Sequence, residues 1–195
     1  MTGQFYLVYS KRLVDLLLVG ILIIFSSWLI VLIFIIYLIT LQFPVLFKSS
    51  RMGEKGAPFT MLKFRTLSGK EELPLIERKF LLGNFLRLTN LDELPQLWNV
   101  LKGEMSIVGP RPLPIEYSTL FSEEQKRRHN VLPGITGWAQ VCGKNDISWQ
   151  EKFELDLYYI NQASLFLDLK ILVKTIILVF SFKKDTSLNE KKFTG

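Results

Sequence analysis

The hydrophobic pattern of this chain is dominated by one apolar run near the N-terminus. Residues 16–47 contain no charged side chain over 32 consecutive positions. Because a helix crosses the hydrocarbon core of a bilayer in about 20 apolar residues, the run predicts a membrane-anchoring helix within residues 1–47. It is longer than the core of a signal peptide, and no small-residue cleavage site follows it, so we expect the anchor to be retained.

The length of the run leaves two membrane geometries open. One is a long, tilted span, and the other is a re-entrant helix that leaves the membrane on the side where it entered. Lys11 and Arg12 precede the run and Lys48 follows it, and basic residues mark the cytoplasmic side. Bases at both ends favour re-entry. The hydroxyls of Ser26 and Ser27 could satisfy backbone carbonyls freed by a bend, so we place the bend there.

Beyond the anchor, the pattern predicts a small domain over residues 48–183 and a polar tail over 184–195. The expected fold class is α+β and mostly helical, with little strand. The expected elements, in chain order, are a loop at 48–58, a strand at 59–67, a helix at 74–88, a helix ending near 101 before Gly103, loops at 105–114 and 133–137, and two helices that follow the capping boxes Ser122/Gln125 and Ser148/Glu151.

The last predicted helix, at residues 165–182, has an apolar stripe that includes Leu169, Ile176 and Phe180. Charged residues interrupt the rest of its surface. The stripe could pack on the core of the domain, or it could lie in the membrane interface as an amphipathic C-terminal helix. The pattern alone leaves both alternatives open.

Charge and reactive residues narrow the classes of function. The chain has 24 Lys and Arg against 18 Asp and Glu, for a net charge of +6. This excess suits anionic partners such as phosphorylated small molecules, anionic lipid or nucleic acid, although it could serve solubility alone. Cys142 and His129 are the only cysteine and histidine, which excludes an intrachain disulfide and a Cys/His zinc site within one chain. Carboxylates, arginines and lysines are therefore the candidates for chemistry.

The Asp92-Glu93 pair is the first candidate site. Pro95 is tolerated only in the first turn of a helix, which makes Asp92 the expected N-cap. A helix start attracts anions and keeps a carboxylate ionised, so Asp92 could attack phosphorus or bind a metal. An ordinary N-cap would have the same sequence.

Two further segments suit phosphate binding. Arg111 stands between Pro110 and Pro112, which would hold its guanidinium ready for a bidentate contact, or which could simply make a rigid turn. In the segment 133–144, glycines permit close approach of the backbone to a ligand, and Lys144 could meet a phosphate. Trp138 could stack on a base or fill the core.

Together these segments resemble the bacterial sugar transferases, the small monotopic phosphoglycosyl transferases. The resemblance covers about residues 9–180 and overrides the simpler readings of Asp92, Glu93 and Arg111. It rests on KRLVD at 11–15, RMG at 51–53, KFRT at 63–66, LDELPQ at 91–96, NVLKG at 99–103, MSIVGPRP at 105–112, PGITGWAQ at 133–140 and DLK at 168–170.

The resemblance implies transfer of a sugar 1-phosphate from a UDP-sugar, an N-acetylated amino sugar, to undecaprenyl phosphate, with release of UMP. The site would lie on the cytoplasmic face of the bacterial inner membrane, and downstream glycosyltransferases would be its partners. Asp92 would be the nucleophile and form a phosphosugar-aspartyl intermediate, and Asp92 with Glu93 would hold Mg2+. The diphosphate would be bound by Lys63, Arg87, Arg111, Pro112 and Lys144.

The sequence departs from the family pattern at four positions. Trp28 replaces the proline of the membrane helix, Leu132 replaces an arginine, Cys142 an asparagine and Lys144 an arginine. These changes motivate an alternative, a catalytically weak, membrane-anchored scaffold that binds UDP-sugar. A nucleic-acid partner is not expected, because the chain lacks an interleaved aromatic and basic motif.

Overall fold

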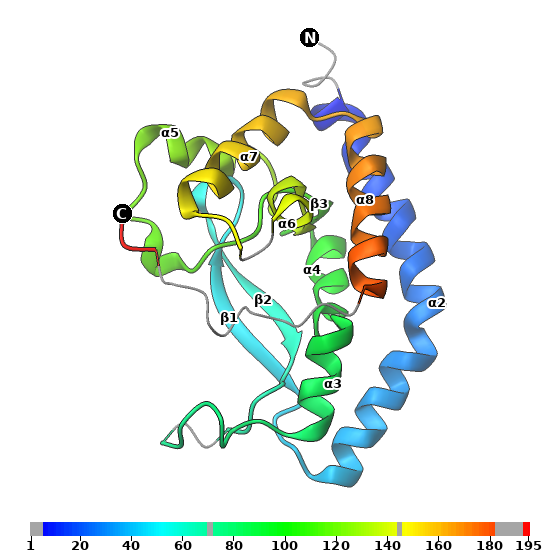
Figure 1. Ribbon diagram of the computed structural model, residues 1–195. Coiled ribbons are helices and arrows are strands. Elements are labelled where there is room, and N and C mark those ends of the chain that lie inside the picture. The colour runs from blue at the N-terminus through cyan, green and yellow to red at the C-terminus, as the bar shows by residue number, and fades with distance from the viewer. Residues whose placement is uncertain (1–5, 70–71, 144–145, 182–192) are drawn as a thin grey trace.

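A long N-terminal helix sets the overall shape of the molecule. The computed structural model describes residues 6–69, 72–143, 146–181 and 193–195. After one π-helical turn at Tyr6–Ser10, helix α2 (Lys11–Thr40) runs along one side of a body of short helices and strands (Figure 1). The expected α+β, mostly helical fold with an apolar N-terminal helix is confirmed.

Helix α2 is long and apolar enough to cross a bilayer. Its 30 residues correspond to a length of about 45 Å. The expected bend does not interrupt it: the helix continues through Ser26 and Ser27, and the Ser27 hydroxyl donates to the Ile24 carbonyl at 3.0 Å. Trp28 is exposed on its outer side. Whether the helix re-enters or spans a membrane stays a prediction.

Both ends of α2 contact the same body. Near the start, the guanidinium of Arg12 donates to the carbonyls of Val100 and Leu101 at 2.6 and 2.9 Å. Near the end, the hydroxyl of Tyr37 donates to the carbonyl of Arg65. The anchor therefore lies along the domain and is fixed to it at two points about seven turns apart.

A buried polar network joins the start of α2 to the last helix, α8 (Leu165–Phe180). The ammonium of Lys11 lies 2.7 Å from Asp168 and 3.1 Å from Asp15. The hydroxyls of Tyr6 and Tyr159 also donate to Asp168, at 2.7 and 2.9 Å. Because buried charges are tolerated only when they are paired, this network fixes α8 relative to α2.

Two strands form a hairpin beside α2. Strands β1 (Leu46–Met52) and β2 (Pro58–Phe64) pair in an antiparallel manner. The expected strand at 59–67 corresponds to β2. The expected loop at 48–58 is wrong over its first half, which belongs to β1. The polar residues 48–51 hide this strand in the sequence, because pairing with β2 defines it rather than an alternating apolar pattern.

The helix expected at 74–88 begins only at residue 81. Helix α3 (Leu81–Thr89) follows Phe80, whose backbone is extended. The N–H of Ser68 donates to the carbonyl of Arg78 at 2.7 Å. This hydrogen bond, between residues ten positions apart, holds the segment before α3 in turns and a bridge. The segment is therefore not helical, although its apolar residues have helical spacing.

The next helix, α4 (Gln96–Lys102), ends at Gly103 as expected, but its start differs. Asp92 lies in a separate 3-10 turn at Leu91–Glu93, and Pro95 occupies the N-cap position of α4. The assignment of Asp92 as the N-cap is therefore wrong. Proline fits this position because the first turn needs no N–H from it.

A second, parallel pair of strands was missed by the sequence analysis. Strands β3 (Ser106–Val108) and β4 (Gly134–Thr136) lie within the segments expected as loops at 105–114 and 133–137. Strands of three residues have too few positions to show alternation. Between them lie a 3-10 turn at Ile115–Tyr117, helix α5 (Glu123–Lys126) and a 3-10 turn at Arg127–Asn130.

Both predicted capping boxes are confirmed. The hydroxyl of Ser122 accepts from the N–H of Gln125 at the start of α5, and that of Ser148 accepts from Glu151. The second box begins α7 (Trp149–Gln162), the longest helix of the domain after α8. The other helix of this part is α6 (Trp138–Cys142).

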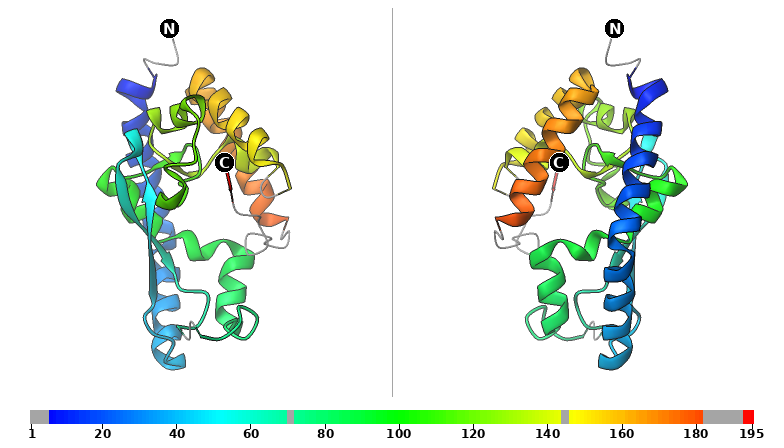
Figure 2. Two further views of the ribbon diagram at one scale, coloured as in Figure 1. Left: turned by 90° about the vertical axis from the view of Figure 1, so that its left-hand side faces the viewer. Right: turned by 90° about the vertical axis from the view of Figure 1, so that its right-hand side faces the viewer.

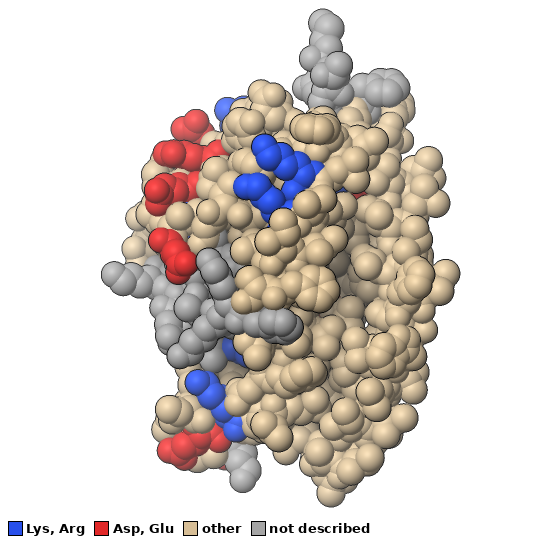
Figure 3. Space-filling view, turned by 45° about the vertical axis from the view of Figure 1, so that its right-hand side comes forward, with Lys and Arg blue, Asp and Glu red and all other residues tan. Residues whose placement is uncertain are grey.

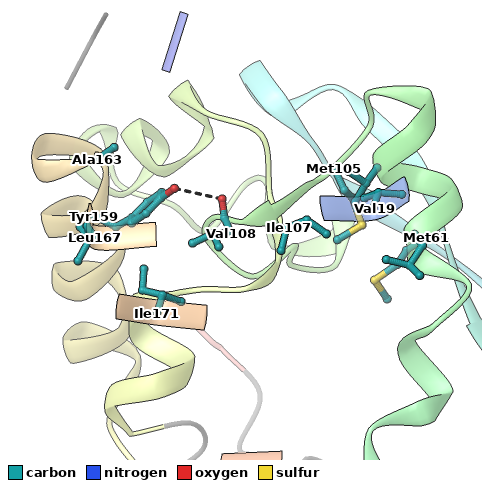
Figure 4. Close-up of a cluster of buried hydrophobic side chains, with 11 residues drawn as sticks. Val19, Met61, Met105, Ile107, Val108, Tyr159, Ala163, Leu167 and Ile171 are labelled. Carbon is teal, nitrogen blue, oxygen red and sulfur yellow. Dashed lines mark hydrogen bonds between the residues drawn. The ribbon is translucent and has the colours of Figure 1, made fainter. Parts of the chain in front are cut away.

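The main core lies between these helices and β3. Figure 4 shows Val19 of α2, Val108 of β3, Tyr159 of α7 and Ile171 of α8 in this cluster. The hydroxyl of Tyr159 donates to the carbonyl of Val108 at 3.1 Å. The core therefore ties the anchor and the C-terminal helix to the short parallel strands.

A smaller aromatic core contains Phe193, within the segment expected to be a polar tail. Its ring lies 5.2–5.8 Å from the rings of Tyr117, Phe121, Trp149 and Phe153. Residues 182–192 lie outside the described part of the chain.

Helix α8 leaves its apolar stripe uncovered. Helices α2 and α8 start close together and diverge (Figure 2). Ile171 faces inward and is buried, whereas Leu169, Ile176 and Phe180 are 50%, 56% and 72% exposed. Of the two alternatives for the stripe, packing on the core is therefore wrong, and a position in the membrane interface stays a prediction.

Candidate active site

A small pocket opens between the β1–β2 hairpin, the 3-10 turn before α4 and the two parallel strands. Each of these segments supplies part of its wall. The lining residues are Arg51, Met61, Lys63, Glu93, Gln96, Arg111, Pro112 and Gly134. Four of the predicted site residues, Lys63, Glu93, Arg111 and Pro112, are therefore brought together.

Glu93 is the acidic centre of this pocket. Its Oε1 lies 2.5 Å from the ammonium of Lys63 and 3.7 Å from the guanidinium of Arg111. Burial alone would raise the pKa of Glu93, but the charges of Lys63 and Arg111 and hydrogen bonds from Lys63 and Gln96 outweigh burial and lower the pKa. Glu93 is therefore ionised at neutral pH and holds two cations at the pocket.

The hairpin presents its cations on one face. Arg51 pairs across the ladder with Phe59, and Lys63 pairs with Phe47. Because alternate residues of a strand share a face, Arg51, Met61 and Lys63 all point to the pocket. Arg51 belongs to a motif of the family resemblance, but no role was expected for it, because β1 was not predicted as a strand.

Arg51 and Arg111 both line the pocket and are close enough for their charges to interact. Burial and the nearby charge of Arg111 lower the pKa of Arg51, while Glu116 and Tyr117 act in the opposite direction. A bound anion would stabilise the charged form of Arg51. Arginine forks suit phosphate in particular.

Short, rigid connections hold Arg111 in place. Its carbonyl accepts from Arg128 at 2.8 Å, and Arg128 is paired with the buried Asp156 at 2.7 Å. A Cβ on Gly134 would lie 2.1 Å from the backbone nitrogen of Gly109. These glycines therefore permit the close approach of β4 to the end of β3, rather than the approach of a ligand alone.

The other predicted site residues are not among the described residues that line the pocket. Asp92 is buried, precedes Glu93 in the same turn and lies within electrostatic reach of Tyr37, but it is not among the described lining residues. Arg87 of α3 donates through Nε to the hydroxyl of Thr66 at 2.7 Å. Lys144 lies outside the described residues.

The donor atoms for the expected Mg2+ are limited to two neighbouring carboxylates. Within the described ranges, no group of three His, Cys, Asp or Glu side chains could hold a metal ion. Mg2+ is commonly bound by one or two carboxylates together with phosphate oxygens of the substrate. Asp92 and Glu93 fit that arrangement when phosphates complete the donor set, and they do not fit a site made by protein alone.

Comparisons with known proteins identify the family. The model of the family described as bacterial sugar transferase matches residues 6–182. The chain is 48% identical over 160 residues to the uncharacterized sugar transferase EpsL of Bacillus subtilis (strain 168), which covers 78% of this chain and 79% of that protein.

Two further relatives are longer proteins. The UDP-glucose:undecaprenyl-phosphate glucose-1-phosphate transferase of Escherichia coli (strain K12) is 41% identical over 152 residues, covering 70% of this chain and 33% of that protein. The galactosyl transferase CpsE of Streptococcus agalactiae serotype III (strain NEM316) is 36% identical over 157 residues, covering 70% and 34%. The chain thus spans about a third of the length of these two.

Proposed function

Because this chain belongs to the bacterial sugar transferase family, we propose that it transfers a sugar 1-phosphate from a UDP-sugar to undecaprenyl phosphate and releases UMP. The reaction takes place at the cytoplasmic face of the bacterial inner membrane, as the first membrane step of a surface glycan or glycoprotein pathway. The observation that carries this proposal is the convergence of Arg51, Lys63 and Arg111 on one pocket beside Glu93. The cations match the charge of a nucleoside diphosphate.

Asp92 is the proposed nucleophile. Its carboxylate oxygen forms a bond to the β-phosphorus of the UDP-sugar, and the bond from that phosphorus to the bridging oxygen breaks. UMP leaves with the electron pair. A phosphate oxygen of undecaprenyl phosphate then attacks the same phosphorus, and the carboxylate of Asp92 is released. One site thereby serves a water-soluble donor and a lipid acceptor in turn.

The surrounding side chains make the approach of two anions feasible. Arg51, Lys63 and Arg111 bind phosphate oxygens and offset the repulsion between the diphosphate and the attacking carboxylate. Glu93 holds Lys63 and Arg111 at the pocket. When bound, Mg2+ would supply further neutralisation of charge on the phosphates, with Asp92 and Glu93 as its protein ligands.

The sugar of the donor is specified less directly than the reaction class. The resemblance in sequence motifs suggests an N-acetylated amino sugar, whereas the named relative from Escherichia coli acts on UDP-glucose. We propose a UDP-linked N-acetylated amino sugar as the donor. A donor panel must include UDP-glucose and UDP-galactose beside the N-acetylated sugars.

The test is nucleotide release by the purified chain in nanodiscs with Mg2+, undecaprenyl phosphate and this donor panel. We expect UMP from the wild type and from Glu124→Gln, which alters an exposed carboxylate of α5. Asp92→Asn should lose turnover while its melting temperature stays near that of the wild type. Release of UDP would mean ordinary glycosyl transfer. Absence of nucleotide with every donor would favour a UDP-sugar-binding scaffold.

A further inference from the structure

The outer side of α8 has an apolar face with a basic border. At 100° per residue, the exposed side chains of Phe166, Val173 and Ile177 share the outer face with the stripe described above. Lys170 and Lys174 follow one another by one turn along a single edge of that face. Figure 3 shows a broad uncharged surface with a compact basic group within it.

The two lysines meet at one tryptophan. The ammonium groups of Lys170 and Lys174 lie 5.2 and 5.0 Å from the ring centroid of Trp138. Trp138 is the first residue of α6, two positions after the end of β4, and stacks on Tyr158 with their ring centroids 6.0 Å apart. The aromatic pair is thereby held against α7, and the lysines are gathered above a fixed ring rather than free in solvent.

This cluster carries positive charge without a matching carboxylate. In the described part of the chain, neither lysine lies within ion-pair distance of an acidic side chain. Like charges four residues apart on a helix repel each other. Their charges also reach Cys142, where burial raises the pKa of the thiol and Lys174 and Lys170 act in the opposite direction. A bound anion would relieve this repulsion.

We propose that Lys170, Lys174 and Trp138 form a binding site for the phosphate group of an anionic phospholipid in the membrane surface. The apolar face beside the lysines argues for a lipid rather than a soluble anion, because it would be covered by acyl chains when the phosphate is bound. Lysines at the edge of such a face extend their ammonium groups to the headgroup layer. Each basic residue near an anionic surface strengthens attachment.

The site lies close to the catalytic pocket along the chain. Gly134 lines the pocket, and Trp138 follows four residues later, a distance of at most about 13 Å even when extended. Thr136, between them, is hydrogen-bonded to Thr175 of α8 at 2.7 Å. A headgroup held at Trp138 would therefore set the height of the pocket above the membrane. This inference needs no catalytic step, so its test is independent of the proposed reaction.

The test measures lipid binding by the full-length protein in neutral detergent micelles. The protein is titrated with short-chain phosphatidylglycerol or phosphatidylcholine, and the melting temperature is followed, because a ligand of the native state raises it. We expect a saturable rise with phosphatidylglycerol only. The double variant K170Q/K174Q should weaken the affinity about 25-fold, at roughly a factor of five per lysine.

Two matched variants separate the site from general effects. K170R/K174R keeps both charges and should retain the affinity. Lys152→Gln removes an ammonium that lies 4.5 Å from the ring of Trp149, outside α8, and should leave the affinity unchanged. A local readout is the alkylation rate of Cys142 near pH 8, which should fall with phosphatidylglycerol in the wild type and much less in K170Q/K174Q.

Several outcomes would overturn the proposal. These are an equal rise with phosphatidylcholine, an unchanged affinity in K170Q/K174Q, or the same rise with inorganic phosphate at equal concentration. A fourth is tighter binding of undecaprenyl phosphate that the double variant abolishes, because the site would then belong to the acceptor substrate.

Discussion

Lys63 is the side chain on which the charge balance of the pocket most directly depends. It lies 2.5 Å from Glu93 and both side chains are largely shielded from solvent. In Lys63→Met, Glu93 would keep the more distant Arg111 and the hydrogen bond from Gln96, and its pKa should rise. We expect kcat/KM for nucleotide release to fall about 100-fold or more, and Lys63→Arg to recover part of it. Wild-type kinetics in Lys63→Met would contradict this role.

His129 links stability to pH. Burial, followed by the charge of Arg128, lowers its pKa to about 4, with a hydrogen bond to the backbone of Lys126 acting in the opposite direction. The folded-state pKa lies below the unfolded value near 6.5, so the folded protein favours neutral His129. The free energy of unfolding is therefore fully retained above pH 6.5 and falls as the pH drops toward 4. The melting temperature should decline over that window, and His129→Gln should flatten the decline. An identical profile in the variant would refute it.

Lys63, Glu93, Arg111 and Pro112 were expected at the site from the family resemblance, and they line one pocket. Local spacing alone left simpler readings of Arg111 and Glu93 open. Arg51 is different, because it joins the pocket only through the pairing of β1 with β2, which no local pattern encodes. The N-cap role of Asp92 failed because Pro95 can itself start α4 after a separate 3-10 turn.

At the scale of elements, the close approach of Gly134 in β4 to Gly109 after β3 leaves no room for a side chain. In Gly134→Ala, the new Cβ would lie 2.1 Å from the nitrogen of Gly109 and 2.4 Å from the carbonyl oxygen of Thr136. We expect a loss of about 1–3 kcal/mol or more of stability, measured by denaturant unfolding in detergent. Gly20→Ala in α2 meets nothing within 4 Å and should be tolerated. Equal stability of the two variants would exclude this packing constraint.

The aromatic core around Phe193 allows a second test of packing. Its side chain is 7% exposed, so Phe193→Ala should cost about 3 kcal/mol by the usual loss for buried phenylalanine. The exposed neighbour Thr194 provides the control, and Thr194→Ala should leave the melting temperature unchanged. A melting temperature of Phe193→Ala equal to that of the control would show that this ring does not contribute to the fold.

The ends of helices could be predicted where side chains near them in the sequence form the cap. The capping boxes at Ser122 and Ser148 and the glycine stop after α4 fall in this class. The strands β1, β3 and β4 were missed because each is defined by pairing with another strand and not by its own pattern of apolar residues. The start of α3 was misplaced because a hydrogen bond between Ser68 and Arg78 overrides the local helical spacing.

At the scale of the whole molecule, the attachment of both ends of α2 to one body favours a membrane geometry with both ends on the same side. The check uses single cysteines at positions 3 and 48 in a Cys142→Ser background, with a reagent that cannot cross the inner membrane. We expect both positions to stay unlabelled in intact cells and to react after permeabilisation. Labelling of Gly3→Cys from the periplasm would instead mean a spanning helix.

Because Lys11 and Asp168 are far apart in the sequence, their hydrogen bond can form only late in synthesis of the chain. The ammonium of Lys11 is buried against a carboxylate that is 157 residues further along the chain. A ribosome that adds about 5–20 residues per second makes Asp168 roughly 8–30 s after Lys11. For most of that interval all of α2 has been synthesised, but the carboxylate that joins it to α8 does not exist. The nascent chain therefore cannot close its polar network until synthesis is nearly finished, and chains truncated before α8 leave Lys11 without that partner.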